Sequence, residues 1–162
     1  MRRTVLKTLA ILGLAALSGC GFQLRGQVPL PFDGAYIDAA PGSGLAAMLS
    51  KQLSLQSKLA PSRDKADVII QLSNENQRKS ILTLSSSGKV QEYRLVYKVT
   101  VAASDASGAE ALPPATLQQV RDFSYNDQAV LAASTQETTL RNEMSQNLVQ
   151  QIMNRLAFVR KK

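Results

Sequence analysis

The sequence LSGC at residues 17–20 contains the only cysteine of the chain, and its setting indicates a thiol that becomes lipid-modified. It closes a segment typical of a bacterial secretion signal, with a positively charged start, an apolar run and small residues beside the cysteine. The apolar run of about nine residues is too short to cross a hydrocarbon core about 30 Å thick as a permanent helix. We therefore expect this lipobox to direct diacylglycerol to the sulfur, residues 1–19 to be removed, and a mature lipoprotein to begin at acylated Cys20. The alternatives are a secreted protein with a chance cysteine, or a retained membrane anchor.

No residue pattern predicts catalysis. The chain has no histidine, which excludes a Ser-His-Asp triad, a Cys-His pair and histidine metal ligands. Residues 62–65 match S-x-x-K, the acyl-enzyme motif of penicillin-binding proteins, but neither S-D-N nor K-T-G accompanies it. Gly88 and Lys89 lack the upstream glycine of a phosphate-binding P-loop. We expect no enzyme, no cofactor and no metal site; a pair among the scattered carboxylates stays open.

The chain is basic, and less so once the signal is removed. Its formal net charge is +7. Without Arg2, Arg3 and Lys7, 16 basic residues face 12 acidic ones, a net charge of +4. This balance favours an anionic partner. Because the signal exports the chain, we expect no nucleic acid and instead an anionic lipid or saccharide of the envelope. The 143 mature residues suffice for one domain, and no cysteine remains for a disulfide.

The residues after Cys20 predict a tether followed by a single domain. Residues 20–33 contain glycine and two prolines and predict an extended, lipidated tether, whereas residues 34–162 predict one folded domain. Residues 35–39 favour a short strand. Ser43 is a candidate cap for a helix whose apolar residues recur at steps of three and four, namely Leu45, Met48, Leu49 and Leu53.

Alternating patterns in the middle of the chain predict three further strands. Residues 67–72 and 81–84 are extended segments, and residues 85–88 read as a hairpin tip. Residues 91–103 alternate most clearly, with one apolar face formed by Tyr93, Leu95, Tyr97, Val99 and Val101. Residues 105–114 favour a loop, and residues 116–125 a weaker strand.

A long C-terminal helix completes the pattern. Ser134 and Glu137 match an S-x-x-E capping box, and an apolar stripe continues to Leu156, although the helix could begin as early as Asp127. The order is strand, helix, three antiparallel strands, helix. We therefore predict an α+β fold, a two-layer sandwich with two helices packed on one face of a mostly antiparallel four-stranded sheet.

Basic residues gather in the predicted strands. Arg94 and Lys98 share one face near the hairpin tip, so that an anion could contact both. For each of these residues alone, a solvated sheet face is a more common role than ligand contact, and a lysine at a sheet edge also discourages strand addition. The candidate ligand-binding set is Arg78, Lys79, Lys89, Arg94 and Lys98.

The start of the mature chain, CGFQLRG at residues 20–26, resembles the C-G-F-x-L-R-G start of the LptE family of lipopolysaccharide (LPS)-assembly lipoproteins. The resemblance continues in order through QEYRL at 91–95, RDFSY at 121–125, VLA at 130–132 and the final helix. It therefore covers essentially the whole mature chain.

This resemblance implies an outer-membrane lipoprotein that plugs the LPS translocon β-barrel, LptD, assists its assembly and binds LPS. In the family, LPS contacts are implied near the hairpin tip and near the start of the final helix. Lys89 lies in the tip here, beside Ser85, Ser86 and Ser87, while Ala133 and Ser134 begin the predicted helix. The expected LPS-binding residues are the five of the candidate set.

The residue after the lipidated cysteine indicates the membrane. Gly21 stands where an aspartate would retain a lipoprotein in the inner membrane. We therefore expect the protein on the periplasmic side of the outer membrane and in the barrel lumen. Two other functions stay open: an accessory lipoprotein of another envelope complex, such as barrel assembly, or a periplasmic ligand-binding lipoprotein.

Overall fold

Four strands and two helices are formed within residues 29–159, the part of the chain that the computed structural model describes. They are β1 (Ala35–Asp38), α2 (Gly44–Leu55), β2 (Val68–Leu84), β3 (Val90–Asp105), β4 (Glu110–Ser124) and α3 (Val130–Leu156), with short 3₁₀ turns at Arg63–Lys65 and Asp127–Ala129. The signal segment, Cys20 and residues 20–28 of the expected tether lie outside the described residues.

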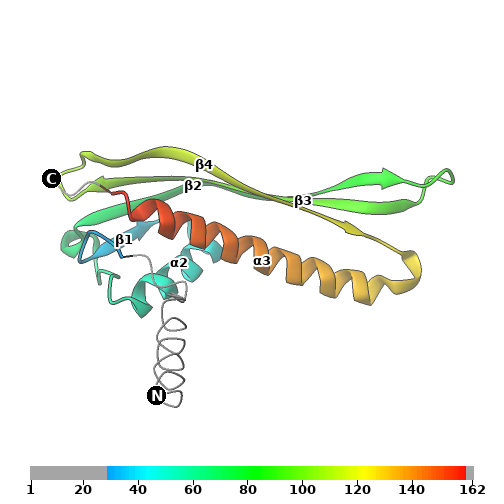
Figure 1. The fold of residues 1–162 in the computed structure, drawn as a ribbon, viewed down its shortest axis with the longest axis horizontal. Coiled ribbons are helices and arrows are strands. Elements are labelled where there is room, and N and C mark those ends of the chain that lie inside the picture. The colour runs from blue at the N-terminus through cyan, green and yellow to red at the C-terminus, as the bar shows by residue number, and fades with distance from the viewer. Residues whose placement is uncertain (1–28, 160–162) are drawn as a thin grey trace, which may run out of the picture.

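The predicted architecture is confirmed. The sheet has the order β1-β2-β3-β4, with β1 parallel to β2 and the other two pairs antiparallel. Figure 1 shows the strands as one layer and both helices beneath it, α3 running along most of the sheet. Both helices therefore bury their apolar stripes against the same face, and the other face of the sheet carries no helix.

The hydrophobic core lies at the end of the sheet where β1 and α2 pack. Leu49 of α2, Val99 of β3 and Leu148 of α3 are all fully buried there. Leu30 and Phe32 also belong to this core, so the last residues of the expected tether are part of the fold because their apolar side chains are buried. Toward the other end burial fades, and Ala133 is the one buried residue among the first fourteen of α3.

Ser43 caps α2, as predicted, and joins it to the sheet. Its Oγ accepts a hydrogen bond from the Ala46 backbone N–H at 2.9 Å and donates one to Glu75 Oε2 at 2.5 Å. The other carboxylate oxygen of Glu75 accepts a hydrogen bond from the hydroxyl of Tyr97, also at 2.5 Å. Burial and this hydrogen bond raise the pKa of Tyr97 well above its ordinary value.

A β-bulge in β2 aims Glu75 at the helices. The register between β2 and β3 shifts between Ser73 and Asn76, and Asn74 adopts a left-handed φ of +52°. Asparagine tolerates this conformation better than most residues. Before the bulge, even-numbered residues such as Leu72 face the core; after it, odd-numbered ones face the helices. The two strand segments predicted at 67–72 and 81–84 are therefore one continuous strand with an inverted second half.

The predicted capping box of the last helix is wrong. An earlier start takes precedence, because the Asn126 side chain accepts a hydrogen bond from the Gln128 backbone N–H at 2.9 Å and begins a 3₁₀ turn that leads into α3. Ser134 therefore lies inside the helix, where its backbone carbonyl accepts a hydrogen bond from Thr138 Oγ1 at 3.0 Å. The alternative start near Asp127 is confirmed.

The loop predicted at residues 105–114 is also too long. The turn is shorter, and β4 begins at Glu110 and includes Pro113 and Pro114. These prolines fit because β4 is an edge strand and its register with β3 shifts beside them, where the ladder needs no proline N–H.

Among the described helices, none is long and apolar enough to cross a membrane.

Candidate functional site

Four of the five candidate cations lie on the part of the sheet beyond the bulge, which we call the distal sheet: residues 76–84 of β2, 90–100 of β3 and 116–124 of β4. The fifth, Lys89, lies in the hairpin tip between β2 and β3. Directly paired residues of neighbouring strands point to the same side of a sheet. Lys79 pairs with buried Leu95 and so lies on the helix face. Arg78 pairs with Val96 on the opposite side, which we call the open face.

Arg94 and Lys98 share the open face, as predicted. Arg94 pairs with Ser80 and Asp122, and Lys98 with Asn76 and Gln118. Arg78 joins them because of the bulge, whereas Lys79 is turned away. The neighbouring residues Arg78 and Lys79 of the candidate set are therefore separated by the thickness of the sheet.

Arg94 is already occupied by an acid. Its Nε and Nη2 each donate a hydrogen bond of 2.8 Å to the two carboxylate oxygens of Asp122 across β3 and β4. The hydrogen bonds and the charge of Asp122 raise the pKa of Arg94, and the hydrogen bonds from Arg94 lower the pKa of Asp122. Both side chains are exposed to solvent, so this pair orients Arg94 more than it stabilises the fold.

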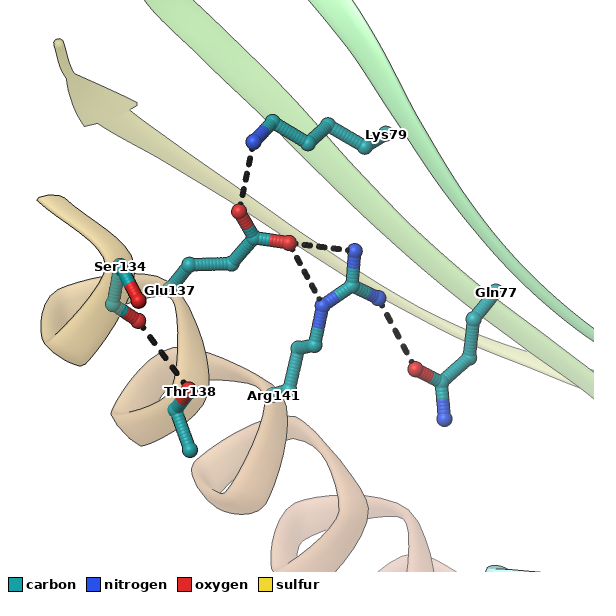
Figure 2. A network of polar contacts seen from close by, with 6 residues as sticks. All are labelled: Gln77, Lys79, Ser134, Glu137, Thr138 and Arg141. Carbon is teal, nitrogen blue, oxygen red and sulfur yellow. Dashed lines mark hydrogen bonds and ion pairs between the residues drawn. The ribbon is translucent and has the colours of Figure 1, made fainter. Parts of the chain in front are cut away.

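Lys79 is held on the helix face by α3 (Figure 2). Its Nζ lies 2.6 Å from Glu137 Oε2, while Arg141 Nε and Nη2 donate to Glu137 Oε1 at 2.9 Å and 2.7 Å. Arg141 Nη1 also donates to Gln77 Oε1 of β2 at 2.9 Å. These polar contacts join the sparsely buried first half of α3 to the distal sheet.

Aromatic rings complete the surroundings of Lys79. Its Nζ lies 4.1 Å from the centre of the Tyr93 ring and 5.6 Å from that of Phe123. Tyr93 in turn stacks on Phe123 and meets Tyr125 edge to face. A cation over aromatic rings and beside a carboxylate is well satisfied within the protein.

The carboxyl of Glu137 provides a pH-dependent contact. Its partial burial would raise its pKa, but the hydrogen bonds from Lys79 and Arg141 outweigh this and leave the pKa below its ordinary value. A lowered pKa in the folded state stabilises the protein above the unfolded-state pKa, and this contribution is lost as the pH falls through the folded-state value.

We therefore expect Glu137→Gln to cost stability near neutral pH and progressively less on acidification. Chemical unfolding of both proteins from about pH 6 to about pH 3 measures this, because other carboxyls titrate in both and cancel in the difference. A difference that stays constant or grows toward acid pH would contradict the role given to Glu137.

Lys89 lies at the hairpin tip, whose prediction is confirmed by a turn with Gly88 at a φ of +79°. The Nζ of Lys89 is 3.6 Å from Asp127 Oδ2, in the turn that precedes α3. Both side chains are well exposed, so an anionic ligand could displace this contact at low cost.

Arg78 and Lys98 differ from the other three candidates. Within residues 29–159 neither makes an ion pair with an acidic side chain, and both are exposed on the open face. The structure thus divides the candidate set into three cations that have acidic partners and two that are available to an external anion.

The acids that engage these cations were not among the residues singled out from the sequence for binding. One contact of these acids could have been predicted from the sequence. Glu137 and Arg141 are spaced i, i+4 on a helix, with the acid N-terminal to the base, which is the favourable order for such a pair. The partners Asp122 and Asp127 depend on strand register and on the position of the hairpin tip.

The S-x-x-K match at residues 62–65 lies in an exposed turn. Residues 63–65 form a 3₁₀ turn, and Arg63 Nη1 pairs with Asp38 Oδ2 at 3.0 Å. Among the described residues, no group of three cysteine, aspartate or glutamate side chains gathers as it would around a metal ion.

Comparison with known proteins connects this fold to a family. The family model described as LptE, lipopolysaccharide-assembly, matches residues 30–156, nearly all of the described chain. The chain belongs to the LptE family. LPS-assembly lipoprotein LptE of Pectobacterium atrosepticum is 29% identical over 156 residues, which cover 92% of this chain and 84% of that protein. LptE of Yersinia enterocolitica is 30% identical, covering 98% of this chain and 78% of its own.

Solved structures show the same fold. The solution structure of lipoprotein B from Nitrosomonas europaea matches with a TM-score of 0.74 and 35% identity, over 85% of this chain and 90% of that one. A minor lipoprotein from Acinetobacter baumannii matches with a TM-score of 0.63 at 24% identity, covering 80% of this chain and 93% of its own, and supports the fold alone.

Proposed function

We propose that this LptE-family protein acts in LPS assembly as an outer-membrane lipoprotein that plugs the LptD β-barrel, assists its assembly and contacts LPS during insertion into the outer leaflet. The observation that carries the proposal is the family match, which spans the fold from the first core residues to the end of α3. The two relatives that align with 92% and 98% of this chain are LPS-assembly lipoproteins by name.

The shape and polarity of the domain support a role as a plug. Large barrels enclose a polar lumen, which a folded domain with a polar exterior can fill. The open face of the distal sheet supplies such an exterior, since it carries Thr100, Thr116 and Gln118 beside the cations. The helices leave this face uncovered along its length (Figure 1).

The cations of the distal sheet support a contact with LPS. Phosphate groups form strong charge-assisted hydrogen bonds with lysine and arginine. The five candidates, Arg78, Lys79, Lys89, Arg94 and Lys98, all lie on this half of the molecule, although on two faces and at the tip. In this proposal the domain presents them to LPS from within the barrel.

Anchoring through Cys20 gives the first test. We expect Cys20→Ala to yield an unlipidated precursor that keeps residues 1–19, because the sulfur that accepts diacylglycerol is missing. Intact-mass spectrometry of the wild-type protein should show acyl mass on Cys20. A free thiol on the mature wild-type protein would exclude the lipoprotein assignment.

A pull-down from outer membranes in mild detergent tests the partner. We expect the LptD barrel to co-purify in amounts close to one per copy of the tagged protein. Depletion of the protein should lower surface LPS and sensitise cells to bulky hydrophobic antibiotics. If depletion left barrel assembly and LPS export intact and no LptD co-purified, an accessory role in another envelope complex would replace this proposal.

A further inference from the structure

We infer that the open face of the distal sheet carries a binding site for a phosphorylated sugar, built around Arg78 and Lys98. The inference rests on the proposed function, in which an anionic glycolipid is the ligand, and it specifies which part of that ligand is recognised and by which residues. The observation behind it is a hollow of about 310 Å³ lined by Asn76, Arg78, Val96, Lys98 and Gln118.

Strand register places the two cations side by side. Arg78 lies opposite Val96 and Lys98 lies opposite Asn76, so that Arg78 and Lys98 are diagonal neighbours on adjacent strands. Diagonal neighbours have their backbones about 7–8 Å apart, within reach of long side chains. Both charged groups can therefore contact a single phosphate placed over Val96.

The surrounding charges leave these cations free for such a ligand. The acid on the open face of the distal sheet nearest in register is Asp122, two residues along β4 from Val120, and both its oxygens are taken by Arg94. Arg78 and Lys98 have no ion pair within the described part of the chain. A doubly charged phosphate there would gain two charge-assisted contacts without displacing an internal partner.

The remaining lining residues suit a sugar. Asn76 and Gln118 carry side-chain amides, which both donate and accept hydrogen bonds and therefore match hydroxyl groups. Val96 and its neighbour Val120, which is 37% exposed, offer an apolar floor for the C–H face of a ring. A bare phosphate would use only the cations and leave the amides and valines without a role.

A larger hollow of the described domain lacks this combination of free cations, amides and valines. That hollow, about 440 Å³ at the opposite end of the sheet, is lined by both Glu110 and Arg63, and Arg63 is already paired with Asp38. At the hairpin tip, Lys89 is paired with Asp127. The inferred site is lined by residues of β2, β3 and β4 and does not include Lys89, so it is distinct from the tip.

Binding of purified lipid A, the phosphorylated glucosamine lipid of LPS, tests the inference. The mature lipidated protein in detergent micelles is titrated with lipid A, with chemically dephosphorylated lipid A and with inorganic phosphate. We expect Arg78→Gln with Lys98→Gln to weaken binding of lipid A about tenfold and to leave binding of the dephosphorylated lipid unchanged. Inorganic phosphate alone should bind far more weakly than lipid A.

The matched control is Lys51→Gln with Lys65→Gln, which removes the same charge from exposed positions away from the hollow. It should bind lipid A like the wild-type protein, and both variants should keep the wild-type thermal midpoint. Equal losses in the two variants would reduce the effect to net charge and overturn the site. Wild-type binding by the Arg78/Lys98 variant would overturn the site while leaving the LPS contact standing. If the wild-type protein bound no lipid A, the LPS contact itself would fall.

Discussion

Replacing Leu148 with alanine should lower the free energy of unfolding by about 3 kcal/mol, because the substitution leaves a cavity where helix and sheet meet. Leu148 is fully buried in the middle of α3, between Met144 and Ile152 on the stripe that faces the sheet. The surrounding side chains come from several elements and cannot all close in on the space that is left. This is among the largest effects expected of a single truncation in the domain.

Urea unfolding followed by circular dichroism measures this effect. Leu131→Ala is the matched control, since it makes the same change on the same helix at a residue that is 86% exposed. We expect the control to change stability by no more than about 0.5 kcal/mol. Similar losses for Leu131 and Leu148 would show that α3 does not pack on the sheet through this stripe.

Glu75→Ala should cost about 1–3 kcal/mol, although Glu75 lies at a bulge and is only partly buried. The substitution removes the carboxylate oxygen that accepts the hydrogen bond of the Tyr97 hydroxyl, and Tyr97 is only 2% exposed, so that water cannot readily replace this acceptor. It also removes the acceptor of Ser43, the residue that caps α2.

A double-mutant cycle separates these contributions. Tyr97→Phe removes the donor as well, so adding it to Glu75→Ala should cost less than the sum of the two single changes. Glu143→Ala, an exposed glutamate of α3, is the control for loss of a carboxylate and should be nearly neutral. Additive effects of Glu75 and Tyr97 would mean that the carboxylate does not accept this hydrogen bond.

Much of the fold follows from side-chain periodicity. The alternation from Tyr93 to Val101 predicted β3 and its buried face, and the apolar stripe up to Leu156 predicted α3. These elements could be predicted because a helix or strand with one buried face repeats its apolar residues at a regular spacing. The element order then limits a single sheet with two helices to very few arrangements.

The errors arose where a local contact competes with that repeat. The bulge at Asn74 inverts the alternation within β2, and no residue pattern marks where the extra residue falls. Ser134 and Glu137 match a cap, but Asn126 provides an earlier one, and Glu137 instead accepts a hydrogen bond from Lys79 on the facing strand β2. The spacing of residues in the sequence shows which contacts a polar side chain could make, but the packing of the folded domain decides which of them form.

The candidate cations show the same limit. Arg94 and Lys98 were correctly placed on one face, because both belong to a single strand with an uninterrupted repeat. The position of Arg78 beside them depends on the bulge, and the availability of Arg78 and Lys98 depends on which acids other strands bring near. The roles of individual cations are therefore properties of the folded sheet.

The fading of burial along the molecule has a consequence for its motions. Residues 76–84 of β2 include no buried side chain and contact the first turns of α3 through polar groups such as Lys79 and Glu137, whereas Val99 of β3 belongs to the hydrophobic core. Segments with few buried apolar contacts open at a lower free energy than the rest of a domain. Backbone amides near Ser80 should therefore exchange with deuterium through local opening, and those near Val99 only when the whole domain unfolds. Such a molecule has a rigid base and an adjustable end, and that end carries the candidate cations.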